Sequence, residues 1–475
     1  RVRKIDRVGE DLELGEGVLV EVEIVLEVPD IGVLGTASIG MEMKAGLGAD
    51  ARPEQRSVAM HAAAQSPVTA VVSAATLSPD SGARRLEEGF WVAVLPFKAA
   101  SGTAEAASLA DGLAEEIVTG LSRFSYLRVI GRGSTMRYAA ERPDLRTVGS
   151  ELGARYVMEA SVRQAANRIR VAVQLVDAST GAQIWAETYE RAFSSSTLFD
   201  VQDDLAPRIV STVADLDGVL PQSMAEALRA KPADQYTPHE ALLRSLRFFK
   251  TFAPEEHALA CTILERAVSE APGRGDCHAM LSHLYSIDYW EQRTSGPEPL
   301  ERALAAAKRA VEATPANNLA HWALALALFF RRDWPAFRAA AQRAIELNPM
   351  DGSVATFMAH LIAYSGEWDR GVAIAEKASA LNPNHAGWHG LLAVYDAYQR
   401  RDYERALEAA LRLDMGDQMQ EFACRAAAYA QLGRTAEARA ALRQLLDKRP
   451  DFAAYGPGFY RRLLLPDLVD HLWEG

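Results

Sequence analysis

The second half of the chain repeats one short phrase, in which an alanine stands five residues before a proline. Four copies end at Pro272, Pro315, Pro349 and Pro383, and the last two gaps between these prolines are both 34 residues. A period near 34 residues, with helix-forming text between the prolines, predicts helix pairs that stack on their neighbours. A single pair cannot bury its apolar face alone, so this half of the chain is constrained to an elongated array.

The alanines of this phrase have a mechanical role in such an array. Small residues let two helices cross closely, and a bulkier residue at a crossing overpacks it at a cost of about 1–3 kcal/mol. A proline just after the helix stops it and lets the next pair change direction. The four phrase alanines are Ala267, Ala310, Ala344 and Ala378.

The repeats are predicted to fill residues 239–475, with about six helix pairs and a short C-terminal cap. The gap from Pro272 to Pro315 is 43 residues, which predicts an insertion at residues 285–299 in the second pair. The fifth pair has an eroded end at residues 414–417. The sixth pair is closest to the pattern of the tetratricopeptide repeat (TPR) family, and the array resembles that family. The matching positions are Tyr429, Gly433, Ala438 and Pro450.

Length and charge limit the classes of protein that fit this chain. At 475 residues it exceeds a single ordinary core, so two or three domains are expected. The net charge of −12 disfavours a general affinity for nucleic acid. No apolar run is long enough to span a bilayer, and no signal peptide is recognisable. Three distant cysteines without CxxC spacing predict buried thiols in a reducing, cytoplasmic setting: Cys261, Cys277 and Cys424.

The first 88 residues carry no motif that assigns a function. Alternation of Val20, Val22 and Ile24 with glutamates predicts a strand, and glycine-rich text follows it. Residues 57–88 are rich in small and polar residues, which is typical of a linker. The chain begins with Arg1 rather than methionine, so we expect a fragment or a processed chain from which an upstream domain is absent.

Residues 89–220 are predicted to form an α/β domain, and residues 221–238 a connector to the repeats. A continuous apolar run predicts a buried strand, and apolar residues at steps of three or four predict the helix after it. Two alternating runs separated by a turn predict an antiparallel hairpin. The expected elements are strands at 90–97, 127–130, 156–162, 169–176 and 184–190, and helices at 106–124, 147–154 and 199–217.

Several stretches of this domain resemble one bacterial family in sequence and in order. They are VAVLPF at 92–97, LADGLAEEIVTGLSRFSYLRVIGRGST at 109–135, and ELGARYVMEASVRQAANRIRVAVQLVDASTGAQIWAETYER at 151–191. Together they resemble the TolB-like amino-terminal domain of bacterial signalling proteins. The resemblance implies a position between an N-terminal effector and C-terminal TPR repeats. The effector in such proteins is an adenylate or guanylate cyclase, a Ser/Thr kinase or a winged-helix domain, and the first 88 residues resemble none of these.

The short polar motifs of the chain fit structural roles better than chemical ones. Residues 131–134 lack the GK[ST] ending of a phosphate loop, and a turn at a strand end fits them better. Asp111, Glu115 and Glu116 suit a solvated helix face better than a catalytic carboxylate pair. The His-Glu pair at 239–240 lacks the second histidine of a zinc-protease motif. With no kinase or nucleophile-elbow signature and no evident histidine ligand set, the sequence predicts no catalytic residue, no cofactor and no metal site.

Large aromatic residues and histidines recur on the predicted first helices of the pairs. In TPR proteins these helices line a concave groove that takes an extended segment or a helix of a partner. Each residue by itself is better explained as core. As a set they make the groove the predicted partner surface, because aromatic anchors dominate binding energy. The predicted groove residues are Trp322, Phe329, His360, Tyr364, Trp388 and Tyr398.

These patterns predict a non-catalytic regulatory or scaffold region of a bacterial signalling protein, which binds a protein or peptide in the groove. No contact with nucleic acid or membrane is expected from this region, and self-association stays open. One alternative is the C-terminal regulatory part of an adenylate or guanylate cyclase or Ser/Thr kinase whose catalytic domain lies upstream. Another is part of a transcription regulator with an upstream winged helix.

Overall fold

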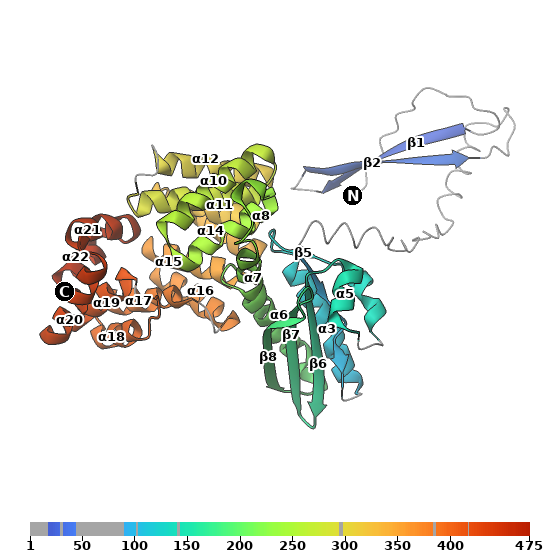
Figure 1. Cartoon of the computed structure of the whole chain (residues 1–475), viewed down its shortest axis with the longest axis horizontal. Coiled ribbons are helices and arrows are strands. Elements are labelled where there is room, and N and C mark those ends of the chain that lie inside the picture. Colours follow the sequence, from blue (N-terminus) through green and yellow to red (C-terminus); the bar gives the residue numbers. More distant parts are fainter. Residues whose placement is uncertain are drawn as a thin grey trace. The chain divides into compact units, whose positions relative to one another are not determined.

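The computed structural model divides the chain into two units, Arg1–Thr76 and Leu77–Gly475, which are described separately here (Figure 1). In the first unit the described residues are the backbone of 18–28 and 32–43. In the second they are residues 90–475 without 101–102, 140–142, 294–297, 383–385 and 417. Among these residues no helix is both long and apolar enough to cross a membrane.

The described part of the first unit is an antiparallel hairpin of β1 (Val18–Val28) and β2 (Gly32–Met43). Val18 pairs with Met43, and the register shifts between Leu26 and Glu27. The alternation of valine and glutamate correctly predicted the first strand. The second strand was missed, because its glycines are typical of loops rather than strands. The predicted linker at 57–88 lies outside the described residues.

A mixed sheet lies at the start of the second unit, in the order β5-β3-β6-β7-β8. The second strand in this order, β3, pairs in parallel with β5 and β6, whereas β6, β7 and β8 form an antiparallel meander. The predicted hairpin is therefore confirmed as β6 and β7. The strands are β3 (Trp91–Val94), β4 (Lys98–Ala99), β5 (Arg128–Val129), β6 (Tyr156–Ala165), β7 (Arg168–Asp177) and β8 (Ala182–Ala192).

Both faces of this sheet are covered, which explains the continuous apolar run in β3. Val92 and Val94 point into the core shared with α3 (Ala104–Leu121) and α6 (Leu198–Ala214). Ala93 and Leu95 belong to a smaller core with residues of α5 (Leu145–Leu152). One predicted strand across 90–97 was too long. Proline at position 96 has no N–H for the ladder, and pairing with β6 resumes only at β4.

The helical array contains six successive helix pairs within the described residues, as the 34-residue period predicts. Several of its helices begin with a side-chain N-cap, at Asn317, Asp333, Asp351 and Asp402. The pairs are α8 (Pro238–Ser245) and α9 (Arg247–Thr251) with α10 (Pro254–Glu270), α11 (Gly275–Trp290) with α12 (Pro299–Ala313), α13 (Asn318–Phe330) with α14 (Trp334–Leu347), α15 (Gly352–Tyr364) with α16 (Trp368–Leu381), α17 (Leu391–Gln399) with α18 (Tyr403–Leu411), and α19 (Met419–Gln431) with α20 (Thr435–Lys448). Helices α21 (Phe452–Leu463) and α22 (Pro466–Glu474) follow the last pair.

Two short segments differ from their sequence-based expectation. The insertion predicted at 285–299 begins as helix, because α11 continues to Trp290 before the chain leaves it. The connector at 221–238 includes most of α7 (Val219–Ala227) and is packed against its surroundings. The Tyr236 hydroxyl, for example, is held by the carbonyl oxygens of Leu228 and Lys231, each at 2.9 Å.

The phrase alanines are all buried at helix crossings, as predicted. Gly371 of α16 has the same role against α15. A Cβ at Gly371 would lie 2.5 Å from the carbonyl oxygen of Ala359 and 2.7 Å from Cβ of Ala363. Neither atom can move without shifting the helix that carries it, so a residue larger than glycine does not fit at this crossing.

We therefore expect Gly371→Ala to lower the free energy of unfolding by about 1–3 kcal/mol, because the added methyl overpacks the crossing. Urea denaturation measures the difference. Gly273→Ala is the matched control, since no atom lies within 4 Å of a Cβ built at Gly273. Equal losses in the two variants would contradict this explanation.

The end of α6 contacts the fourth helix pair, far along the chain. Asn382 Nδ2 donates to Asp215 Oδ2 at 3.4 Å, and Ser353 Oγ donates to Asp217 Oδ2 at 3.0 Å. Burial raises the pKa of the Asp215 carboxyl well above its ordinary value, and the charges of Asp217 and Asp351 add to the shift. This contact holds the sheet and the array together, and we call it the α6 junction.

Candidate functional site

A cavity of about 150 Å³ lies among the first helices of the pairs, beside the α6 junction. Most of its walls are aromatic and aliphatic, and the polar side chains among them include Asp217 and Glu291. α11, α13, α15 and α17 each contribute side chains, and α21 closes one end. The residues used below are Phe249, His283, Trp322, Phe357, His360, Tyr364 and Trp388.

Five of these rings form a continuous series across four helix pairs. Phe249 contacts His283 with ring centroids 4.9 Å apart, and His283 lies 4.2 Å from Trp322. Trp322 in turn lies 5.8 Å from Phe357, which lies 5.9 Å from Trp388. We call this series the aromatic ladder. Three of its members are only half-buried, so the ladder has solvent-accessible faces for another molecule.

The two histidines of the cavity wall are neutral at physiological pH. Burial lowers the pKa of His283 to about 3 and that of His360 to about 4. Neighbouring imidazoles act in the same direction, since His257 disfavours a charge on His283. Both imidazole rings are therefore uncharged, and the carboxylates in the cavity wall are those of the partly exposed Asp217 and Glu291.

Among the polar atoms of the wall that have no hydrogen-bond partner within the described residues, two belong to the aromatic ladder. They are the indole Nε1 of Trp322 and Nδ1 of His283, both buried. An indole N–H can only donate, and a buried donor left unpaired costs about 1–3 kcal/mol. The wall thus offers a fixed donor to an incoming acceptor such as a peptide carbonyl.

The predicted groove residues fall into two sets. Trp322, His360, Tyr364 and Trp388 line the cavity together, and His360 lies 5.4 Å from Trp388. Phe329 and Tyr398 do not line it.

Phe329 is fully buried against Phe330, Trp334 and Phe337, so it acts as core. Tyr398 is equally buried, and its hydroxyl donates to the carbonyl oxygen of His471 at 3.3 Å in the C-terminal helix. Both residues are core residues with no exposed surface for a partner.

Sequence reasoning missed His283, Phe357 and Phe249 as members of the site. A signal was present for the first of these. His283 and His360 each stand eleven residues after a phrase proline, Pro272 and Pro349, and so occupy equivalent repeat positions. Comparing repeat positions rather than single helices would have placed both rings on the same surface.

The acidic residues at 111 and 115 lie on a solvated helix face, as predicted. Both side chains are more than half exposed, and both pair with Arg132. Residues 131–134 differ from the expected turn, because Arg132–Thr135 form the short helix α4.

Comparisons with known proteins each match part of the chain. Residues 88–208 match the family described as the second domain of HilA/YgeH-like transcriptional regulators. A stretch of 244 residues is 36% identical to "Putative adenylate cyclase 3" of Rhizobium meliloti (strain 1021). This match covers 51% of the present chain and 40% of that protein, so the chain spans less than half of its curated relative.

The solved structures resemble the chain only distantly. PilF of Pseudomonas aeruginosa is 15% identical, with a TM-score of 0.34 over 50% of this chain and 96% of its own. The TPR protein YrrB is 14% identical, with a TM-score of 0.28 over 45% and 98%. Human IFIT1 is 14% identical, with a TM-score of 0.39 over 48% and 55%.

Proposed function

We propose that this chain is a non-catalytic regulatory region that binds a protein or peptide segment through the aromatic ladder. The observation that carries the proposal is the ladder itself, a series of rings at 4.2–5.9 Å that borders an apolar cavity across four helix pairs. Aromatic side chains supply large contact area at low conformational cost, and they are enriched among binding hot spots.

The chemistry of the cavity wall limits which kind of peptide segment can bind. Neutral histidines and half-buried rings favour a large apolar side chain, because these rings bring no charge that an apolar group would desolvate. The unpaired Trp322 donor favours a backbone carbonyl beside that side chain. The proposed partner is therefore a peptide segment with an aromatic or aliphatic anchor.

The relatives support placing this region in a signalling protein. The identity to a protein named as an adenylate cyclase favours a regulatory part of a cyclase, in which a TolB-like domain and TPR repeats follow a catalytic domain. The family match over residues 88–208 instead favours a transcription regulator. In both cases the proposed role of this chain is binding, and catalysis or DNA recognition belongs to another part of the protein.

A peptide display screen on the immobilised full chain tests the binding role. We expect enrichment of peptides with a large apolar side chain, and roughly tenfold weaker binding of such a peptide by Phe357→Ala, since hot-spot truncations cost at least 1–2 kcal/mol. Fluorescence anisotropy with the labelled peptide measures the affinity.

Phe199→Ala is the matched control, because the Phe199 side chain is 74% exposed on α6 and lies outside the cavity. It should bind the peptide as the unmodified chain does. A screen without enrichment, or equal affinity of the two variants, would rule out the aromatic ladder as the binding surface.

A further inference from the structure

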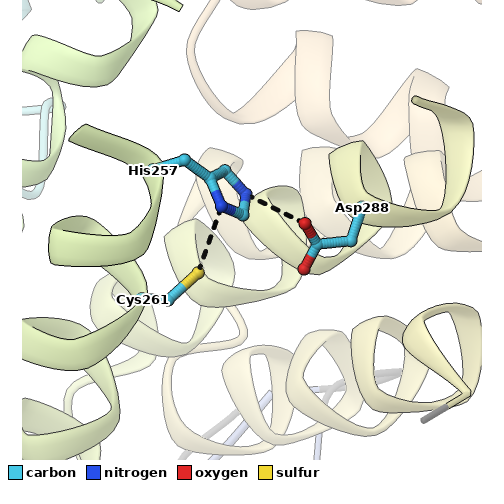
Figure 2. Close-up of side chains that lie close together, drawn as sticks. All are labelled: His257, Cys261 and Asp288. Carbon is cyan, nitrogen blue, oxygen red and sulfur yellow. Dashed lines mark hydrogen bonds and ion pairs between the residues drawn. The ribbon is translucent and has the colours of Figure 1, made fainter. Parts of the chain in front are cut away.

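Three potential metal ligands meet between the first and the second helix pair, and none of them belongs to the aromatic ladder (Figure 2). His257 and Cys261 are one helical turn apart on α10, and Asp288 comes from α11. The imidazole lies between the other two groups. Its Nδ1 is 3.9 Å from the Cys261 Sγ, and its Nε2 is 3.4 Å from Asp288 Oδ1.

The two α10 residues differ in type from the residues at the equivalent positions of the next three helix pairs. His257 stands ten residues before the phrase alanine Ala267, where the next three pairs have Leu300, Trp334 and Trp368. A large apolar residue at this position serves packing, so a histidine there is not required by the fold.

The cysteine position shows the same departure. Cys261 stands six residues before Ala267, and the next three pairs have Leu304, Arg338 and Val372 there. The first pair alone among these four combines an imidazole and a thiol at the two positions.

The carboxylate comes from the segment that interrupts the repeat period. α11 has 16 residues, whereas α13 and α15 have 13, and all three start three residues after a phrase proline. The extra turn of α11 contains residues 288–290. Asp288 therefore stands where the other two helices have already ended, and the longer helix brings it over α10.

We propose that His257, Cys261 and Asp288 bind a thiophilic divalent cation, with Zn²⁺ as the best match. A thiolate, an imidazole and a carboxylate are the three ligand types that zinc takes in proteins. One ligand atom from each residue lies within 4.8 Å of the ligand atoms of the other two. Bond lengths to zinc place thiolate and imidazole donors roughly 3.6 Å apart, close to the 3.9 Å between Sγ and Nδ1.

The other nitrogen of the imidazole, Nε2, is positioned to make the outer hydrogen bond of a metal-binding histidine. His257 Nε2 lies 3.2 Å from the carbonyl oxygen of Leu284, which can accept its N–H. Such an outer hydrogen bond fixes the tautomer and leaves Nδ1 as the metal ligand. The Asp288 carboxylate, which contacts Nε2 in the structure, completes the set by turning toward the Nδ1 side of the ring.

Protonation and charge also suit a metal. Burial lowers the pKa of His257, so its ring is neutral and can coordinate. Burial raises the pKa of Cys261 to about 12, so a cation must displace the thiol proton. One divalent cation balances one thiolate and one carboxylate, which leaves no net charge at the site.

The site is open to solvent on one side. His257, Cys261 and Asp288 line a surface cleft of about 790 Å³, together with Glu265 and Arg302. With three protein ligands and an accessible cleft, the fourth position of a tetrahedral site remains for water or for a partner group.

Titration of the full chain with Co²⁺, after treatment with a chelator, tests the site. Cobalt bound to a thiolate gives a sulfur-to-metal charge-transfer band, and Zn²⁺ should displace it. We expect this band in the unmodified chain and its loss in Cys261→Ser. His257→Gln and Asp288→Asn should each weaken Zn²⁺ binding by more than about tenfold, since even outer-shell changes cost that much.

Cys277→Ser is the matched control, because this buried thiol lies on α11 and contacts the carbonyl oxygen of Pro238 at 3.4 Å. It should retain the band and the affinity. Circular dichroism melts in chelator separate loss of a ligand from loss of the fold. The absence of a charge-transfer band in the unmodified chain, or its persistence in a folded Cys261→Ser, would overturn the proposal.

Discussion

Replacing Trp322 by alanine is expected to lower the free energy of unfolding by about 3–5 kcal/mol, the range for a large aromatic residue removed from a core. Only 2% of its surface is exposed, and it contacts both His283 and Phe357. The neighbouring helices are held by their own pairs, so they can close little of the void. The midpoint of urea unfolding, followed by far-ultraviolet circular dichroism, measures the loss.

Trp473→Ala is the control with the same change of side chain. Trp473 is 42% exposed on α22 and stacks on Phe452, so its removal should cost below about 1.5 kcal/mol. A loss at Trp322 no greater than at Trp473 would show that the cavity wall is not part of the folded core. A large loss at Trp322 also makes this residue unsuitable for testing partner binding, for which the half-buried Phe357 is better suited.

Asp351→Asn is expected to raise the free energy of unfolding at neutral pH by up to roughly 3 kcal/mol, because it removes the charge of a buried carboxylate. Asp351 is fully buried at the start of α15. Its Oδ1 accepts from the Val354 N–H at 3.0 Å, and its Oδ2 accepts from Asn318 Nδ2 at 2.9 Å. Burial raises the pKa of the carboxyl from 3.8 to about 6, more than these hydrogen bonds lower it. Asparagine can keep the N-cap without carrying a charge.

The direction of the pH dependence follows from this raised pKa. Below about pH 3.8 the carboxyl is protonated in both the folded and the unfolded state, so it does not lower the free energy of unfolding. As the pH rises to about 6 the unfolded chain gives up its proton first, so the wild type loses stability across this interval. The advantage of Asp351→Asn should therefore grow between pH 4 and 7 and then level off.

Urea unfolding of both proteins at several pH values measures this difference. Asp333→Asn provides the matched comparison, because Asp333 caps α14 in the same way but is exposed. We expect no comparable pH-dependent gain from it. A difference between wild type and Asp351→Asn that stays constant from pH 4 to 7 would contradict a raised pKa for Asp351.

Much of the fold could be predicted because its signals are local and repeated. The phrase ending at Pro315 and Pro349 predicts helix pairs, and the alternation in β6 and β7 predicts their hairpin. The errors arose where contacts between residues distant in the sequence determine the end of an element. The extra turn of α11 follows no propensity in the inserted text, and the end of β3 depends on where Pro96 falls against β6.

The candidate sites were less predictable than the fold. Four of six predicted groove residues line one cavity, since position on a first helix is readable from the period. Whether a ring faces the cavity or the core, as with Phe329, depends on the crossing angle of neighbouring pairs. The cluster of His257, Cys261 and Asp288 could not be predicted from spacing alone, because Asp288 lies 27 residues beyond Cys261 on another helix.

The α6 junction restricts how this repeat array can change in length. Asp215 and Asp217 meet Asn382 and Ser353, so three complete helix pairs separate the two sides of one contact along the chain. Deleting or duplicating a pair within that interval would shift the fourth pair by a whole repeat and leave the buried Asp215 and the partly buried Asp217 without these partners. Pairs beyond α16 are free of this restriction. Related chains are therefore expected to keep the number of helix pairs between α6 and α16 constant.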